Sequence, residues 1–291
     1  MAQYHCLIAG LRELQADAEA KGFDTVALRD EIVGDLTPAD AEVLREFYFF
    51  YDVANLIALL AGKNNFSALG NLSVAELREA VGQTADEPGC LPPYVAEVLS
   101  AYRSKKDDKG DDDSEIDTEQ PIEKVLWSRY YERMGVSPNG FVRAWYAFDR
   151  TLRNVCAAIT ARAQEREIGP ELVGQGEIET LLARSSASDF GLKNELDYLD
   201  RLFHILDETN MVDKERRLDA LRWDTADELT VFEYFTLDKV LAYCVKINII
   251  HRWMALDKAV GRAMFERLVA DLSGIPAQSG NTEPGDDRPE K

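Results

Sequence analysis

The chain is poor in the residues from which catalytic and metal sites are usually built. Its 291 residues include only three histidines, His5, His204 and His251, and none is paired at the i, i+4 spacing of a helical zinc site. His204 lies in an apolar helical stripe and is interpreted as a helix-flank residue. His251, near the end of a long apolar segment, is the better candidate for a functional histidine. There is no P-loop and no Gly-x-Ser-x-Gly elbow. We predict no catalytic, cofactor-binding or metal-binding residue.

Two stretches come close to a known site and fall short of it. Gly174-Gln175-Gly176 lacks the third glycine of a dinucleotide fingerprint, because Glu179 stands in its place, and no strand precedes it. Asp111-Asp112-Asp113 lacks the glycine and the terminal glutamate of an EF-hand calcium loop. We interpret both stretches as solvated loops.

Cysteine is scarce, and long apolar runs are missing. The four cysteines, Cys6, Cys90, Cys156 and Cys244, have neither metal-ligand spacing nor the density of an exported disulfide framework, so we expect reduced, buried thiols. No apolar run reaches the roughly 18 residues that span a bilayer. Residues 1–6 carry no basic region of the kind that opens a signal peptide. These absences predict a cytoplasmic protein.

Positive charge is also in short supply. The chain has 33 Lys and Arg residues against 53 Asp and Glu residues, a net charge of −20. A field of this sign repels nucleic-acid phosphates and anionic lipid headgroups, so we expect no nucleic acid and no direct lipid anchor. It attracts basic protein surfaces, which makes a basic protein the expected kind of partner.

What the sequence does contain is helical periodicity. Helices are expected after the N-cap Thr37, after the capping box at 73–76, from Pro92-Pro93, after Pro121, and from a cap at Ser137-Pro138 to about residue 167. Further helices are expected around 192–206, at 232–255 and at 257–272. Alternating strands are absent, so we predict an all-α, multi-helix fold. The segment 4–10 is left open between a strand and a helix.

Composition divides the chain into five segments. We predict a first helical unit at 1–104, an acidic disordered linker at 105–120, a second helical unit at 121–175, a third at 176–275 and a mobile tail at 276–291. The linker contains one apolar residue, Ile116. Such a stretch buries too little apolar surface to offset the entropy of ordering it.

One short pattern occurs twice and, more weakly, a third time. Its skeleton is Asn, apolar, x, Ala, x, Leu/Ile, x, small, Lys/Arg, and it is found at 55–63 and 154–162; the weaker copy begins at Asn248. An aromatic-rich run precedes each copy (47–51, 145–148 and 232–235) and is expected in the core. An asparagine in an apolar helix is costly unless its amide is hydrogen-bonded. We therefore interpret these asparagines as structural pins at a helix-to-helix or helix-to-loop junction rather than as catalytic groups.

The first copy resembles a known family. The phrase at 52–63 is similar to the Asp-x-x-Asn-Leu-x-x-Leu-Leu-x-x-Lys phrase of the C subunits of archaeal and bacterial V/A-type rotary ATPases, which are the equivalents of the eukaryotic d subunits. Residues 4–11 resemble an uncharacterised bacterial family whose genes accompany V-type ATPase operons. The residues that carry over are Asp52, Asn55, Leu56, Leu60 and Lys63, then Asn154, Ile159 and Arg162 in the second copy, and Asn248 in the third. The second copy departs in its acid, Asp149, which stands five residues before the asparagine.

The resemblance implies three similar helical units in a funnel-like arrangement. It further implies a non-catalytic connector that links the membrane rotor ring to the central-shaft subunits and is peripheral to the membrane through these protein partners. Two other interpretations remain open from the residues alone. One is an acidic helical scaffold that binds another basic protein; the other is an enzyme with a carboxylate-lined cleft or with His251 in its site.

Overall fold

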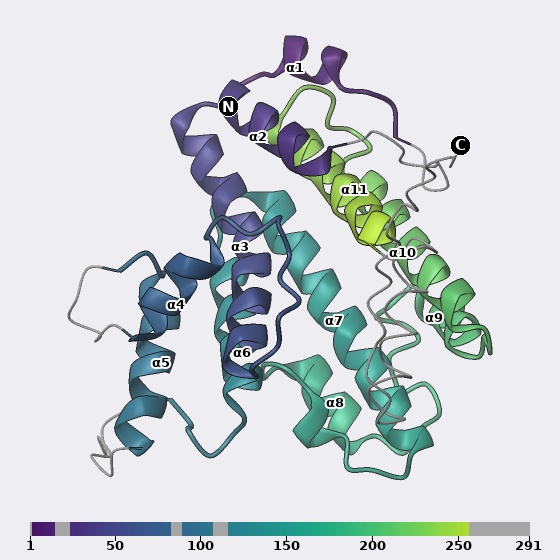
Figure 1. Cartoon of the computed structure of the whole chain (residues 1–291). Helices are drawn as coiled ribbons and strands as arrows, with labels where there is room; N and C mark the ends of the chain where they lie inside the picture. Colours follow the sequence, from purple (N-terminus) through teal and green to yellow (C-terminus); the bar gives the residue numbers. More distant parts are fainter. Residues whose placement is uncertain (1, 15–23, 83–88, 107–115, 256–291) are drawn as a thin grey trace, which may run out of the picture. The chain divides into compact units, whose positions relative to one another are not determined.

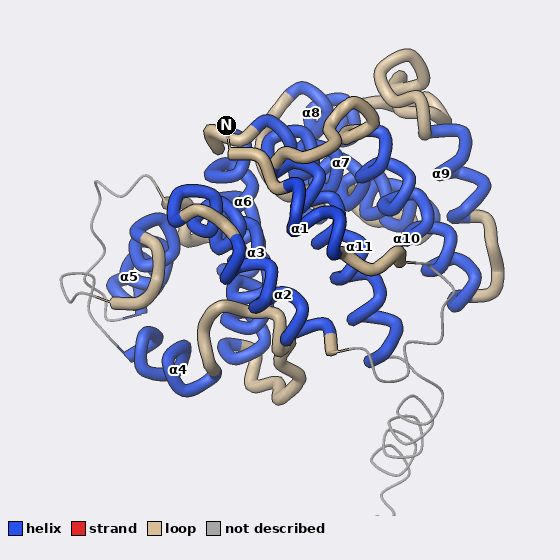
Figure 2. Tube along the Cα trace, turned by 90° about the horizontal axis from the view of Figure 1, so that it is seen from above, coloured by secondary structure: helices blue, strands red, loops and turns tan. Residues whose placement is uncertain are grey.

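The computed structural model describes residues 2–14, 24–82, 89–106 and 116–255 (Figure 1). Over these ranges the chain forms helices and loops and no strand, as the tube in Figure 2 shows. The all-α prediction is therefore confirmed, and His5–Gly10 is helical rather than extended. The predicted helix at 257–272, the tail at 276–291 and the acidic run at 107–115 lie outside the described residues.

The helices follow one another along the chain. They are α1 (His5–Gly10), α2 (Thr25–Asp35), α3 (Pro38–Leu60), α4 (Val74–Gly82), α5 (Pro93–Lys106), α6 (Ile122–Gly135), α7 (Gly140–Ala163), the 3-10 helix η1 (Gly169–Glu171), α8 (Glu177–Arg184), α9 (Leu199–Leu206), α10 (Met211–Glu228) and α11 (Leu237–Ala255).

Two compact units divide the chain, residues 1–249 and residues 250–291. Of the second unit only 250–255, the last residues of α11, are described. The five-segment division and the three-unit funnel expected from the sequence stay predictions.

Several helices begin at the caps that the sequence indicates. The Thr37 hydroxyl accepts a hydrogen bond from the Asp40 amide at 3.3 Å and opens α3, with Pro38 in the first turn. Ser73 and Glu76 form the reciprocal capping box before α4, with the Ser73 amide 2.7 Å from Glu76 Oε2. Gly62, at φ +69°, follows the end of α3 in the left-handed conformation that glycine adopts most easily.

The expected boundaries of three helices are wrong. The helix expected around 192–206 begins only at Leu199, because residues 191–198 form turns and loop before it. Helix α7 is capped by Asn139, whose Oδ1 accepts from the Val142 amide at 2.8 Å, and not by Ser137. It ends at Ala163 instead of about 167. Helix α11 begins at Leu237 rather than at 232, because residues 229–236 form turns before it.

Helix α3 contributes buried residues such as Leu44, Phe47 and Leu56 to the core. It packs against α2, α4 and α6, and α6 packs in turn on α5 and α7. An aromatic cluster fills the junction of α3, α6 and α7: the hydroxyls of Tyr130 and Tyr146 both donate to the Phe47 carbonyl, at 3.1 and 2.7 Å. A continuing apolar core joins α7 to α8, α9 and α10 around Leu152, Leu182 and Leu202.

Residues 116–120, at the end of the acidic segment, contact α5. The Lys105 ammonium donates to the Thr118 carbonyl at 2.8 Å and pairs with Glu119 at 2.7 Å. The Tyr102 hydroxyl also donates to the Gln120 carbonyl. The last residues of the predicted linker, 118–120, therefore make specific contacts with α5.

The expectation that all four cysteines are buried is wrong for three of them. All four are free thiols, but Cys6 is exposed, Cys90 and Cys156 are only partly buried, and Cys244 alone is buried. Separately, no helix in the described ranges is long and apolar enough to cross a membrane.

Candidate functional site

The first copy of the repeated pattern holds the loop that follows α3. Asn55 is 3% exposed on α3 and uses both ends of its amide on one residue of that loop. Its Nδ2 donates to the Ser67 carbonyl at 2.9 Å, and its Oδ1 accepts from the Ser67 amide at 2.7 Å. The side-chain amide of Asn55 thus pairs with Ser67 as the backbone of a neighbouring segment would. Of the two junctions considered from the sequence, this is a helix-to-loop junction.

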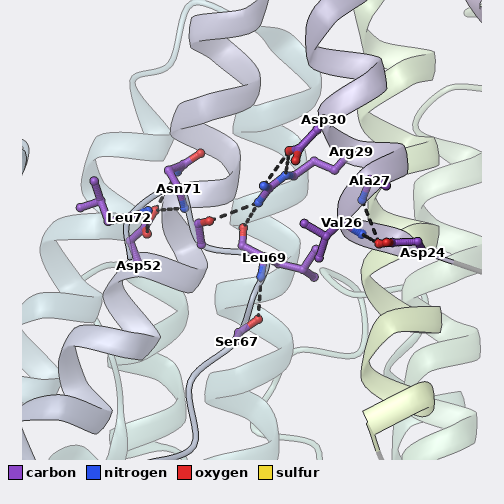
Figure 3. Close-up of polar contacts among 11 residues, drawn as sticks. Asp24, Val26, Ala27, Arg29, Asp30, Asp52, Ser67, Leu69, Asn71 and Leu72 are labelled. Atoms are coloured by element: carbon purple, nitrogen blue, oxygen red, sulfur yellow. Dashed lines mark hydrogen bonds and ion pairs between the residues drawn. The ribbon is translucent and has the colours of Figure 1, made fainter. Parts of the chain in front are cut away.

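Asp52, one turn earlier on α3, holds the next part of the same loop (Figure 3). Its carboxylate accepts from the Asn71 and Leu72 amides at 3.0 and 2.8 Å and from Asn71 Nδ2 at 2.7 Å. Asp52 is only 1% exposed. Burial raises the pKa of this carboxyl, and the hydrogen bonds from Leu72 and Asn71 oppose the rise.

Arg29 on α2 contacts the same loop through two backbone carbonyls. Its Nη1 lies 2.7 Å from the Leu69 carbonyl and 3.2 Å from the Gly70 carbonyl, and its other nitrogens bind Asp30 (Figure 3). A side chain at residue 70 would collide with the motif, since a Cβ there would lie 2.7 Å from Asp52 Oδ1. Glycine is therefore required by the close approach of the loop to α3.

The second copy makes the same contact with a different loop. Asn154, fully buried on α7, donates from Nδ2 to the Val173 carbonyl at 2.9 Å and accepts the Val173 amide on Oδ1 at 2.9 Å. Its Nδ2 also donates to Glu179 Oε1 at 2.9 Å. A short helix, α8, follows this loop, just as α4 follows the loop held by Asn55. Each copy is therefore a long helix, an amide-held loop and a short helix.

The acid of the second copy comes from a different place in the chain. Thr151 stands where Asp52 stands in the first copy, three residues before the asparagine, and the buried carboxylate is Glu179 on α8 instead. Arg150 pairs with Glu179 Oε1 at 3.4 Å. The predicted acid of this copy, Asp149, accepts instead from the Tyr131 hydroxyl at 2.6 Å. Each asparagine therefore has a buried carboxylate nearby, but Glu179 bonds Asn154 itself, whereas Asp52 bonds the amides of the loop.

The last residues of the two copies are not equivalent in structure. Lys63 lies beyond the end of α3 and is exposed, whereas Arg162 lies within the last turn of α7. Arg162 donates to the Ala187 and Ser185 carbonyls at 2.7 and 2.8 Å and covers the Phe190 ring at 3.6 Å. Helix α7 continues for longer after its asparagine than α3 does. Lys63 and Arg162, which match in the sequence pattern, therefore lie at different points relative to the helix ends.

The remaining residues of the pattern are split between core and surface. Leu56 is 1% exposed, whereas Leu60 is 38% exposed. Ile159 packs against the core that joins α7 to α10. Asn248 on α11 differs from its two counterparts: its Oδ1 is buried and has no hydrogen-bond partner. The described residues thus contain two amide-held loops.

These contacts leave the motif little capacity for chemistry. The amides of Asn55 and Asn154 are occupied by backbone groups, and Asp52 accepts three hydrogen bonds. A shallow pocket of about 340 Å³ lies over the first loop and is lined by Asn55, Phe66, Ser67, Ala68, Gly70, Asn71, Leu72, Ser73 and Val74. Its lining includes no carboxylate. Within the described ranges, no group of three His, Cys, Asp or Glu residues is placed to hold a metal ion.

Sequence reasoning misses the partners of the motif. Ser67 and Val173 stand 12 and 19 residues after their asparagines, so no constant spacing marks them. Arg29 lies within the first 36 residues, where the helical pattern is ambiguous. In the sequence, Glu179 stands out only as the residue that breaks a dinucleotide fingerprint. The one local signal is a glycine in each loop, Gly70 and Gly176. A Cβ atom added at either glycine would lie only 2.7 Å from a buried carboxylate oxygen.

Comparison with known proteins identifies the chain as a member of a described family. Residues 1–274 match the family described as protein of unknown function (DUF2764), and the chain belongs to that family. No curated protein and no solved structure matches the chain.

Proposed function

We propose that the protein is a non-catalytic connector subunit of a V/A-type rotary ATPase, joining the membrane rotor ring to the central shaft. The observation that carries the proposal is the repeated amide clamp. Asn55 and Asn154 hold a loop by the same pair of hydrogen bonds in two helix–loop–helix units. Asn55 and Asp52 belong to the phrase that resembles the C subunits of these ATPases.

The mechanical demands of such a connector agree with these contacts. A torque-transmitting protein requires long helices whose connecting loops do not move independently. In the first unit, Asp52 and Asn55 on α3 and Arg29 on α2 hold the loop at 67–72 from two helices. In the second, Asn154 on α7 holds the loop at Val173, and Asn154 is itself bonded to Glu179 on α8. The net charge of −20 favours basic shaft ends or basic ring loops as partners.

A second candidate is an acidic helical scaffold that binds another basic protein. It is favoured by the exposure of Phe232 and Tyr234, which are 84% and 67% exposed before α11. It differs from the first proposal only in the identity of the partner. The enzyme interpretation, with a carboxylate-lined cleft or His251, has no such observation in its favour among the described residues.

Direct binding tests the proposal. The purified full chain would be mixed with the detergent-solubilised rotor ring, and separately with the central-shaft subunits, of a V/A-type ATPase from the same organism. We expect complexes that elute together in gel filtration. An unrelated acidic helical protein of similar charge is the control for nonspecific attraction. Failure to associate with either partner at low salt would refute the connector role.

A further inference from the structure

The connection between α10 and α11 exposes a group of large apolar side chains. The aromatic run at 232–235 is expected in the core from the sequence, but the structure places it at the surface. The exposed fractions in the whole group are 38% for Leu229, 58% for Val231, 84% for Phe232, 67% for Tyr234 and 39% for Phe235. We name residues 229–236 the aromatic turn. A contiguous exposed group of this kind marks an interaction site more often than an isolated apolar residue does.

The backbone of the aromatic turn is fixed, although its rings face outward. The Phe235 carbonyl accepts from the Tyr4 amide at 2.7 Å, and the Phe235 ring lies 4.1 Å from the His5 ring. Within the turn, the buried Thr230 hydroxyl donates to the Ala226 carbonyl at 2.9 Å. An anchored turn loses little conformational entropy when its side chains are covered, which favours its use as a docking surface.

The α2–α3 and α6–α7 connections lie close to the aromatic turn. Tyr4, which holds Phe235, also bonds through its hydroxyl to Thr37 and Asp40 at the start of α3. Asn139, in the α6–α7 connection, donates to Asp238 at 2.6 Å at the start of α11. Figure 1 shows the α10–α11 connection close to α1 and α2. The α2–α3, α6–α7 and α10–α11 connections therefore lie close together.

Carboxylates surround this meeting point. The pKa of Asp238 is raised by burial and by the nearby negative charges of Glu233 and Asp40. Glu228 and Asp35, each at the end of a helix that leads into one of the connections, are exposed.

The basic side chains nearby are engaged. Lys239 contacts Thr230 and Asp227, and Arg143 donates to the Ser137 carbonyl. The carboxylates named above outnumber these two cations, so the rim of the aromatic turn is acidic. An apolar centre with an acidic rim complements a partner with an apolar stripe and a basic edge.

We propose that the aromatic turn docks a basic amphipathic helix supplied by another protein. The apolar face of that helix covers Phe232 and Tyr234, and its Lys and Arg side chains pair with the acidic rim. A second copy of this chain is disfavoured as the occupant by its net charge of −20, and an anionic lipid surface is disfavoured for the same reason. This inference stands apart from the connector role, because it does not depend on which complex supplies the helix.

Binding of a designed peptide to the full chain tests the proposal. The probe is a fluorescent helix of about 18 residues with Leu and Trp on one face and Lys and Arg on the other. We expect binding that weakens as salt rises from about 50 to about 300 mM. The double variant F232S/Y234S is expected to weaken binding by about tenfold or more. The matched control, M211S/V212S, removes apolar side chains that are 65% and 52% exposed at the start of α10, and should change affinity less than about twofold.

Two further readouts require no variant. A peptide with Lys and Arg replaced by Glu should bind at least about tenfold more weakly. Hydrogen exchange on the wild-type chain should show new protection at 229–236 when the basic peptide is added. The proposal is overturned if the basic peptide does not bind, if its charge-reversed or scrambled version binds equally well, or if F232S/Y234S binds as the wild type does. It is equally overturned if sedimentation shows that the aromatic turn joins two copies of this chain.

Discussion

Asn154 and Val173 exchange two hydrogen bonds of 2.9 Å, and Asn55 and Ser67 exchange a matching pair. In both cases a side-chain amide on a long helix satisfies the donor and the acceptor of one residue in the following loop. Backbone groups of a loop that packs against a helix have lost their access to water, so an unpaired group there costs free energy. The loop can pack closely against the helix because the asparagine pairs with both of its buried backbone groups.

Removing the second amide should destabilise the fold. Asn154→Ala leaves the Val173 amide and carbonyl unpaired in a buried site, so we expect a loss of about 2–4 kcal/mol in the free energy of unfolding. Urea denaturation followed by circular dichroism measures this. Asn65→Ala, at an exposed position, is the matched control and should change stability by less than about 0.5 kcal/mol. Equal stabilities for the two variants would contradict the role of Asn154.

Much of the helical arrangement is encoded locally and could be predicted. The Thr37 cap, the Ser73 to Glu76 capping box and the left-handed Gly62 act within a few residues of one another, so their pattern is legible in the sequence. The need for Asn55 and Asn154 to find partners also follows from their apolar surroundings.

The partners themselves are set by tertiary packing, which short-range patterns do not record. Ser67 and Val173 reach equivalent places although they stand 12 and 19 residues after their asparagines. The aromatic run at 232–235 has the composition of a core segment, yet α11 starts only at Leu237 and leaves its rings outside. A partner protein is one reason for a sequence to keep such rings on its surface.

Gly70 should not tolerate even the smallest side chain. In Gly70→Ala the new Cβ would lie 2.7 Å from Asp52 Oδ1 and 3.0 Å from Asn55 Nδ2, which forces the loop away from α3. We expect a loss of about 1–3 kcal/mol in the free energy of unfolding. Gly34→Ala, in α2 with open space around it, should instead stabilise by about 0.5–1 kcal/mol. Thermal unfolding of the two variants gives opposite shifts if the packing is as described, and shifts of the same sign would count against it.

Asp52 should make stability depend on pH. Because burial raises its pKa in the folded state, the folded chain binds this proton more tightly than the unfolded chain does. Its contribution to the free energy of unfolding is therefore fully present below the ordinary pKa of an aspartate. It is lost as pH rises through the raised value. The difference in stability between the wild type and Asp52→Asn, from urea denaturation at a series of pH values, isolates this group. We expect the wild-type advantage to shrink with rising pH; growth of that advantage would mean that the pKa is lowered instead.

Thiol reactivity should separate the cysteines by burial. Burial raises the pKa of Cys156 to about 11 and that of Cys244 to about 12, so both thiols are protonated in the folded chain, and Cys244 is also buried. Cys6 is exposed and should react first with a disulfide reagent. Cys6→Ser should remove the fast phase and leave the rest unchanged, with Cys244 reacting only after denaturation. Fast labelling of Cys244 in the native protein would be inconsistent with its position on α11.

Site-resolved hydrogen exchange at Ser67 and Val173 tests the clamp most directly. In the wild type both amides donate to an asparagine Oδ1, so both should be protected from exchange. Asn154→Ala should remove protection at Val173 while Ser67 stays protected, and Asn55→Ala should do the reverse, each under conditions where the rest of the chain remains folded. Unchanged exchange at Val173 in Asn154→Ala, or loss of protection at both loops at once, would contradict two independent, equivalent clamps.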